Sequence, residues 1–218
     1  MEEEEEEQMR AARIGGLRLH NASIQLMDYS SEWRALFVRE GERVRAVLGE
    51  RVLMLEHVGS TSVPGLAAKP TIDMLLAVAD SADEPAYMPA MEAAGYMLRI
   101  REPEWHQHRL LKGPHTNVNL HVFSVGCPEI DRMLLFRDRL RSNEADRDLY
   151  ERAKRELAKQ TWKYVQNYAD AKTTVVEEII ARARAAVMVE EAQQRDFVES
   201  TLAKERLSVA RSDLRSLE

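Results

Sequence analysis

The residue types that could carry chemistry are concentrated between two short apolar runs. Gly59 can adopt backbone conformations that other residues rarely tolerate, and its lack of a side chain lets a ligand approach the main chain. Ser60 and Thr61 follow with hydroxyl donors, and Lys69 adds a cation. Asp73 is a lone carboxylate within an otherwise apolar run. Together these residue types predict a site for phosphate or for a metal–phosphate pair.

Two strands must position these residues. Val52–Leu55 and Ile72–Val78 are short hydrophobic runs on either side of a segment rich in glycine, serine and proline, a pattern typical of buried strands joined by a loop. A carboxylate in the second strand is costly unless something pairs with it. A ligand-binding role for Asp73 therefore competes with a structural one, in which its carboxylate caps Lys69 or a nearby backbone amide.

The segment His57–Asp73 resembles the GrpB family, which is assigned to the nucleotidyltransferase superfamily. It matches the pattern HVGST-x-VPGL-x-AKP-x-ID at every named position. A long motif of this kind is specific, whereas a bare Gly-Ser pair with a distant Asp would be weak. The resemblance runs from roughly Ile24 to Ala185 and includes Asp28–Trp33, Asn119–Phe123, Leu134–Asp138 and Tyr168–Lys172.

The resemblance implies that the Gly-Ser turn opens a helix whose N-terminal amides face a triphosphate. It also implies carboxylates that hold two metal ions, of which Asp73 is the first. Leu75 occupies the second position, and Asn119 and His121 stand where the superfamily places a third acid. One Asp with a His could hold a single Mg²⁺ or Mn²⁺ ion, or the ligand could bind without metal.

Two histidines, His57 and His121, fall inside the family motifs. Either could donate a hydrogen bond to phosphate or act as a general acid–base. A second hypothesis brings His106, His108 and His121 together on adjacent strands as a transition-metal site. Hairpin histidines are more often polar surface or satisfied core residues, which is the competing interpretation.

Basic side chains could neutralise phosphate charge near this site. Arg137, in the sequence LLFRD, is predicted to face the ligand, because its planar guanidinium suits phosphate. The alternative for Arg137 is an ion pair with Asp138 or Asp131. The other nearby cations are Arg109, Lys112 and Arg141.

Length and composition predict one ordinary globular domain. The chain has 218 residues, of which 44% are hydrophobic, and its net charge of -6 argues against a broad nucleic-acid-binding face. The single cysteine, Cys127, excludes an intrachain disulfide. The sequence shows no apolar signal segment and no run of about 20 apolar residues for a membrane helix. A cytoplasmic location is the default expectation.

The order of elements predicts an α+β fold with a mixed or antiparallel sheet of the nucleotidyltransferase type and helices packed on one face. A helix is expected from Ser31 to Leu48 and another within Asp83–Ala94. Tyr96–Ile100, Trp105–Leu111 and Asn117–Phe123 read as strands, the last two as a hairpin. From Pro128 onward the pattern is helical, with breaks near Asn143 and Thr173.

Both ends differ in composition from the central domain of residues 24–186. Residues 1–23 contain the block Glu2–Glu7, whose like charges predict a disordered acidic extension. Residues 187–218 alternate acids and bases with sparse apolar side chains, which predicts a helical extension. It is either a solvated end or a helix that mediates self-association or partner binding.

Two functional hypotheses follow. The first is a nucleotidyltransferase that binds a nucleotide through Gly59, Ser60, Thr61, Lys69 and Arg137, with Asp73 holding the metal. The second is a non-catalytic module that binds a nucleotide or a coenzyme A precursor. The second rests on the resemblance, since GrpB-like domains are fused to dephospho-coenzyme A kinase in some bacteria. In both hypotheses the partner is a small phosphate-containing molecule.

Overall fold

Five strands form one mixed sheet in the order β1-β2-β5-β4-β3. Strands β2 and β5 are parallel, and the other neighbouring pairs are antiparallel. The computed structural model describes the backbone of residues 2–215 and the side chains of residues 4 and 6–198. The strands are β1 (Met54–Val58), β2 (Ile72–Val78), β3 (Met97–Glu102), β4 (His108–Lys112) and β5 (Val118–Ser124).

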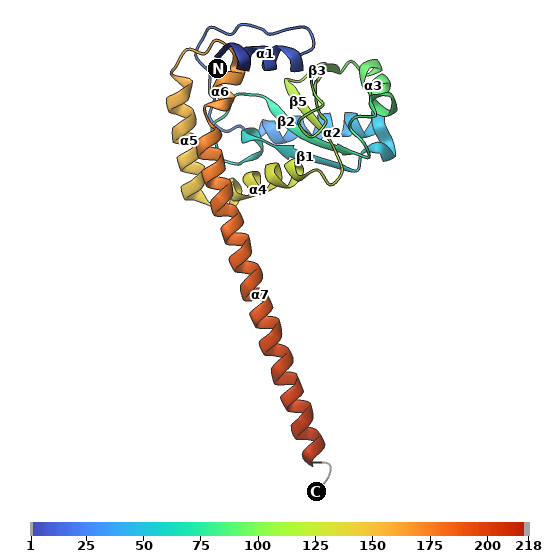
Figure 1. Cartoon of the computed structure of the whole chain (residues 1–218), viewed down its shortest axis with the longest axis vertical. Coiled ribbons are helices and arrows are strands. Elements are labelled where there is room, and N and C mark those ends of the chain that lie inside the picture. The colour runs from blue at the N-terminus through green and yellow to red at the C-terminus, as the bar shows by residue number, and fades with distance from the viewer. Residues whose placement is uncertain (1, 216–218) are drawn as a thin grey trace.

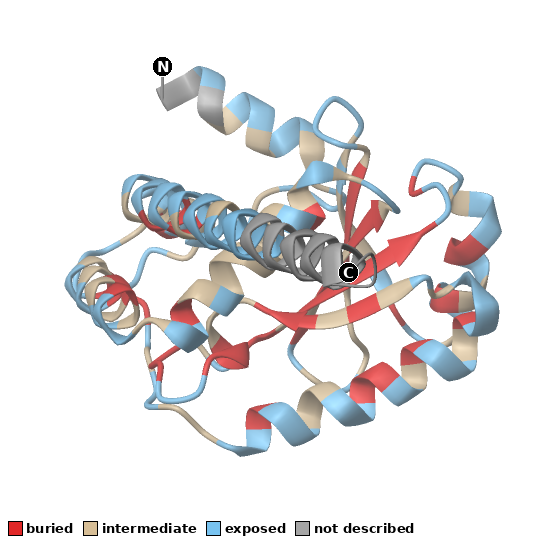
Figure 2. Cartoon of the chain, turned by 90° about the horizontal axis from the view of Figure 1, so that it is seen from below, coloured by how far each residue is buried: buried red, intermediate tan, exposed pale blue. Residues whose placement is uncertain are grey.

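Seven α-helices and two short 3-10 turns accompany the strands in this part of the chain. Figure 2 shows buried strands at the centre of the domain and exposed surface along the helices. The helical elements are α1 (Glu2–Ala12), α2 (Glu32–Leu48), η1 (Gly49–Arg51), η2 (Ser60–Ser62), α3 (Glu84–Ala93), α4 (Pro128–Ser142), α5 (Glu144–Ala158), α6 (Val165–Asp170) and α7 (Thr173–Arg215).

Alternation along β2 and β5 gives the sheet two different faces. Met74 and Leu120 point to one face, where they join a core with residues of α2 and α3. Leu75 and Phe123 point to the other face, where Ile130 of α4 packs against them. The prediction that the helices pack on one face is therefore wrong. Strands β2 and β5 are apolar on both faces over part of their length, so each face requires a covering helix.

Three polar residues of β2 and β5 lie on the α4 face, whereas Ser124, at the end of β5, lies on the opposite one. The parallel register places Asp73 beside Asn119 and Leu75 beside His121. Asp73, Asn119 and His121 thus share one face, because alternate residues of a strand point the same way. The fold brings together three positions that are 48 residues apart at their extremes in the chain.

The predicted hairpin strand Trp105–Leu111 begins later than expected. Residues 103–107 form a turn in which His106 and Gln107 have φ angles of 54° and 51°, and β4 starts at His108. His106 therefore does not share a strand face with His108. The break predicted at Asn143 is confirmed: its side-chain oxygen accepts a hydrogen bond of 2.9 Å from the backbone of Asp146 and caps α5.

The acidic N-terminal block lies in helix α1, which differs from the disorder that its like charges predict. Glu6 accepts a hydrogen bond of 2.9 Å from the Tyr164 hydroxyl and forms an ion pair with Lys163. Arg13 forms a β-bridge with Ile100 of β3. These contacts attach the segment to the domain and offset part of its charge.

Helix α7 begins in the domain and extends well beyond it (Figure 1). Ile179, Ile180 and Ala183 are buried, and Arg182 pairs with Asp146 of α5. Between 187 and 198 large apolar side chains such as Met188 and Phe197 are exposed. The apolar side chains predicted at 202, 207, 209, 214 and 217 lie outside the described residues. The helix passes through the predicted boundary at 186/187 without a break.

We predict that ending the chain after Ala186 leaves the melting temperature of the domain nearly unchanged. The described side chains beyond that point lie outside the core, so their removal exposes little buried apolar surface. Thermal denaturation followed by circular dichroism measures the effect. The control is Ile179→Ala, which should cost about 2–4 kcal/mol as a buried truncation. A comparable loss from the truncation would contradict the prediction.

Candidate functional site

The loop between β1 and β2 brings the backbone of Gly59 against the carboxylate of Asp73. Gly59 has a φ of 68°, in the left-handed region that favours glycine. A Cβ atom built at Gly59 would lie 2.5 Å from Oδ2 of Asp73, which is far inside contact distance. The need for glycine here comes from both the backbone conformation and the approach of the carboxylate.

The helix that the resemblance implies after Gly59 is not formed. Ser60–Ser62 make a single 3-10 turn, and Val63 returns to an extended conformation. A turn this short has little aligned dipole and few free amides. The expected anion site at a helix N-terminus is therefore not formed, and side chains of other elements contact the loop instead.

Helices α4 and α5 hold the loop through its polar groups. Arg141 donates two hydrogen bonds, of 3.0 and 2.9 Å, to the carbonyl of Ser62. Lys154 donates to Oγ of Ser60 at 3.1 Å and to the carbonyl of Ala67. Burial, followed by the repulsion of Lys172, lowers the pKa of Lys154 to about 7. Lys154 is 2% exposed, so it supports the loop from within the protein.

Asp73 is paired mainly with side chains of β5. Nδ2 of Asn119 donates a hydrogen bond of 2.7 Å to Oδ1 of Asp73, and Nε2 of His121 lies 3.8 Å from the same oxygen. Burial alone would raise the pKa of the Asp73 carboxyl, but His121, Asn119 and the charge of Lys69 together lower it. Asp73 is therefore ionised near neutral pH, and its side chain is 27% exposed.

Three lysines lie close enough to Asp73 for its charge to raise their pKa values: Lys69, Lys112 and Lys172. Burial is the larger influence in each case and lowers the pKa. For Lys172 the result is a pKa of about 8, with the charge of Lys69 also lowering it. The charge of Asp73 thus acts on three ammonium groups, and the charge of Asp170 also acts on Lys172. We name the three lysines, with Asp73, Asn119 and His121, the Asp73 cluster.

Two predicted site residues, His57 and Thr61, belong to the structural support. His57 is paired with Met74 in the β1–β2 register, so it points to the opposite face from Asp73, where its ring stacks on Phe37 at 4.8 Å. Its Nε2 lies 3.0 Å from Oγ1 of Thr61, which donates to the carbonyl of Thr71. Both side chains are buried. Neither is placed to reach a ligand at Asp73.

Arg137 forms ion pairs rather than standing free beside the cluster. It contacts Glu56 at 2.7 Å and Asp138 at 2.8 Å, and it donates to the carbonyl of His57 at 3.1 Å. The pairing with Asp138 is the alternative that the sequence left open. Arg109, another predicted cation, pairs with Glu84 at 2.5 Å beneath α3 on the opposite face.

The donor set does not fit a two-metal centre. Among the described side chains, no group of three or more His, Cys, Asp and Glu residues is arranged to hold a metal ion. Asp73 is the one carboxylate in its cluster, and Leu75 is buried in the core. The lysines beside Asp73 further disfavour a divalent cation by repulsion. The proposed histidine metal site is also not assembled, since His106 lies in the turn before β4.

Sequence reasoning missed Lys154 and Lys172 as parts of the site. Lys172 ends the family motif Tyr168–Lys172, so its position carried a signal that was not used. Its ammonium group lies 3.9 Å from the centroid of the Tyr168 ring. Lys154 sits in a charged helical sequence where nothing local distinguishes it from its exposed neighbours. Only the packing of α5 against the loop shows that it is buried.

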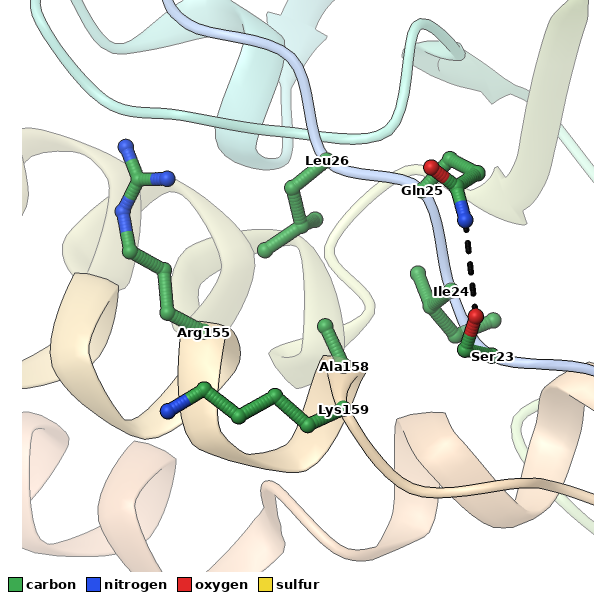
Figure 3. A pocket seen from close by; sticks show the side chains of 7 residues that line it. All are labelled: Ser23, Ile24, Gln25, Leu26, Arg155, Ala158 and Lys159. Atoms are coloured by element: carbon green, nitrogen blue, oxygen red, sulfur yellow. Dashed lines mark hydrogen bonds between the residues drawn. The ribbon is translucent and has the colours of Figure 1, made fainter.

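A pocket elsewhere on the surface is separate from this cluster. Figure 3 shows that it is lined by the extended segment 23–26 and by side chains of α5 and its C-terminal end. It contains two cations, Arg155 and Lys159, but Arg155 is paired with Asp28 and Glu151. None of its lining residues belongs to the Asp73 cluster. They are Ser23, Ile24, Gln25, Leu26, Arg155, Ala158 and Lys159.

The fold and the cluster define a class: an α+β protein whose mixed sheet carries one carboxylate among several lysines beside a glycine turn. The GrpB protein family matches residues 23–182 of the chain. The chain therefore belongs to the GrpB family. The matched range ends within α7.

Individual relatives agree with this assignment. A UPF0157 protein from Halalkalibacterium halodurans is 58% identical over 180 residues, which are 83% of this chain and 92% of that protein. The crystal structure of conserved protein GrpB from Enterococcus faecalis has a TM-score of 0.67 and 31% identity, and covers 75% of this chain and 99% of that one. A dephospho-CoA kinase from Mycolicibacterium paratuberculosis is 27% identical over 171 residues. The match covers 66% of this chain and 42% of that protein.

In the described part of the chain, no helix has the length and apolar character needed to cross a membrane.

We predict that Gly59→Ala destabilises the protein more than Gly65→Ala. Both glycines have positive φ angles, 68° and 80°, so alanine at either position carries a backbone cost of about 1–3 kcal/mol. The ψ angle of -176° places Gly59 in a region that is essentially restricted to glycine. A Cβ at Gly65 has nothing within 4 Å, whereas one at Gly59 collides with Asp73. The collision should add about 1–3 kcal/mol. Urea denaturation of the two variants measures the difference, and equal losses would refute the close-approach argument.

We predict that His57 makes the protein sensitive to acid. Burial, only partly offset by Asp73, lowers the pKa of His57 to about 4 in the folded state, whereas the unfolded value is near 6.5. The unfolded state therefore binds more protons between these values, and stability falls as the pH drops from 6.5 to 4. The contribution is at most about 3 kcal/mol. His57→Gln, which keeps an N–H donor toward Thr61, should flatten this part of the unfolding free energy against pH. An unchanged slope would disprove the assignment.

Proposed function

We propose that the Asp73 cluster binds a small phosphate-containing molecule, either a nucleotide or a coenzyme A precursor. The observation that carries the proposal is the excess of lysine charge. Lys69, Lys112 and Lys172 lie within electrostatic range of the Asp73 carboxylate, and Asp170 also acts on Lys172. A partly buried group of like charges is unfavourable by itself, and an anion relieves both the repulsion and the lost hydration. The chemistry of the donors favours phosphate over a metal ion.

The glycine turn supports the same proposal. Gly59 has no side chain, so its backbone can be approached closely by both Asp73 and a ligand. The carbonyls of Ser62 and Ala67 are directed toward Arg141 and Lys154, which fixes the loop on α4 and α5. A binding site formed in advance loses less conformational entropy when the ligand arrives.

The relative named dephospho-CoA kinase supports the coenzyme A class of ligand. The chain matches less than half of that protein, so the matched part is one segment of a longer chain. A module joined to an enzyme of this name would be well suited to bind the same phosphate-bearing compounds. The inference concerns the ligand class alone, since similarity of fold does not carry activity with it.

Nucleotidyl transfer is the second candidate, and a specific observation favours it. The Gly-Ser turn stands directly against Asp73 on the adjacent strand, as the resemblance to the nucleotidyltransferase superfamily implies. The incomplete acidic set argues against it, because such chemistry relies on metal ions held by several carboxylates. The two candidate functions differ in the role of Asp73. In nucleotidyl transfer Asp73 holds a metal ion, whereas in simple ligand binding it pairs electrostatically with the lysines.

The decisive measurement is calorimetric titration with AMP and with dephospho-coenzyme A, each with and without Mg²⁺. We expect metal-independent binding that weakens at least about 10-fold in Lys172→Met, because a charge-assisted hydrogen bond is lost. Binding should also take up protons near pH 8, since phosphate raises the pKa of Lys172 from about 8. Titrations in buffers of different ionisation enthalpy reveal this uptake.

One further variant is a control, and another separates the two candidate functions. The control, Lys159→Met, removes a surface cation whose side chain is 69% exposed and should leave binding unchanged. Asp73→Asn retains an acceptor for Asn119 but removes the negative charge, so anion affinity should stay equal or rise. Binding that needs Mg²⁺ and disappears in Asp73→Asn would instead support nucleotidyl transfer. Absence of binding by all nucleotides and coenzyme A precursors would overturn both candidates.

A further inference from the structure

A row of three hydrogen-bonding side chains leads from the edge of the sheet to Asp73. Oε2 of Glu102, on β3, lies 2.6 Å from Nδ1 of His108 on β4. Nε2 of His108 lies 3.1 Å from Nδ1 of His121 on β5. His121 then turns its Nε2 toward Asp73. Phosphate binding by the lysines does not require Glu102 or His108, so the row calls for its own explanation.

His108 is enclosed by aromatic rings and is 3% exposed. Its ring stacks on Phe123 at 4.8 Å and meets Trp105 edge-on, with centroids 5.3 Å apart. The planes of the His108 and His121 rings are 19° apart and their centroids 5.2 Å apart, which suits a hydrogen bond between ring nitrogens. Burial lowers its pKa, with the contact to Glu102 opposing the shift. His108 is thus neutral at neutral pH and carries one ring proton.

The position of that proton follows from the neighbours. An ionised Glu102 can only accept hydrogen bonds, so the proton of His108 must be on Nδ1. Nε2 of His108 is then an acceptor, and Nδ1 of His121 must donate to it. Glu102 thus fixes the tautomer of His108, and His108 fixes that of His121. The unprotonated Nε2 of His121 is then directed into the Asp73 cluster.

The gap between His121 and Asp73 indicates what belongs there. Nε2 of His121 and Oδ1 of Asp73 are 3.8 Å apart, too far for a direct hydrogen bond. In the tautomer fixed by His108, neutral His121 has no proton on Nε2, so both atoms are acceptors. Only the doubly protonated ring of His121 would supply the hydrogen bond and charge that lower the pKa of Asp73. A group that brings a hydrogen is therefore needed beside them, while the lysines require an anion. A phosphate ester that also carries a hydroxyl meets both requirements.

We propose that Glu102 and His108 are positioning residues that hold His121 with its proton on Nδ1, so that Nε2 accepts a hydrogen bond from a ligand hydroxyl. The ligand part of this inference rests on the proposed function, and it narrows the ligand to a phosphate ester bearing a hydroxyl. The tautomer part concerns the protein alone and is measured without ligand.

The first test is nitrogen-15 NMR of the imidazole rings in the full-length protein near pH 7.5, with His121 assigned by His121→Asn. We expect the wild type to have His121 protonated on Nδ1. Glu102→Lys puts a donor at Nδ1 of His108 and should reverse both tautomers, whereas Glu102→Gln keeps an acceptor oxygen and should preserve them. Wild-type His121 protonated on Nε2, or unchanged tautomers in Glu102→Lys, would overturn the proposal.

The second test compares AMP with inorganic phosphate by calorimetry. His108→Phe fills the same aromatic space but removes the hydrogen bond that orients His121. The affinity for AMP should then fall about 5-fold, which corresponds to the loss of one neutral hydrogen bond. The affinity for inorganic phosphate should stay the same. Equal loss for both ligands, or protonation of Nε2 when phosphate alone is added, would refute a hydroxyl contact. If neither ligand binds, the proposed function fails. The NMR result then still tests whether Glu102 and His108 fix the tautomer of His121.

Discussion

The contact of the Gly59 backbone with the Asp73 carboxylate is the constraint on which the site depends. It joins the end of β1 to the start of β2 at a distance that no side chain at position 59 would permit. The carboxylate is thereby held against the β5 side chains Asn119 and His121. Because the antiparallel β1–β2 pair and the parallel β2–β5 pair meet at Asp73, a shift in either register would separate these groups.

The lysines around this carboxylate are stabilised by unequal means. Lys154 has its hydrogen bonds within the protein and is effectively part of the loop. Lys69, Lys112 and Lys172 share the charge of Asp73, and burial lowers the pKa of each. Desolvated charge of one sign is costly to the folded state, which is a recurrent property of binding sites. The described side chains around Asp73 are thus rich in lysine and lack the several carboxylates that two metal ions would require.

The two faces of the sheet are covered by different helices. One face is covered by α2 and α3, and there His57 and Arg109 are satisfied by Thr61 and Glu84. On the other face α4 packs against apolar residues of β2 and β5, and the side chain of Asp73 is 27% exposed. Residues of the same motif therefore lie on different faces of the sheet, according to the direction in which each strand turns them. His57 and Asp73, at the two ends of one motif, fall on opposite sides.

The sequence by itself determined the family, the positions of most elements, and the importance of Gly59 and Asp73, because periodicity, turn residues and a long motif are local signals. It could not show that helices cover both faces of the sheet, because an apolar segment does not specify which other element packs against it. It also could not show that Arg137 is paired with Glu56 or that Lys154 is buried. Those outcomes depend on contacts between residues about 80 or more positions apart. The tertiary structure decided them, because burial and charge pairing are properties of the packed chain.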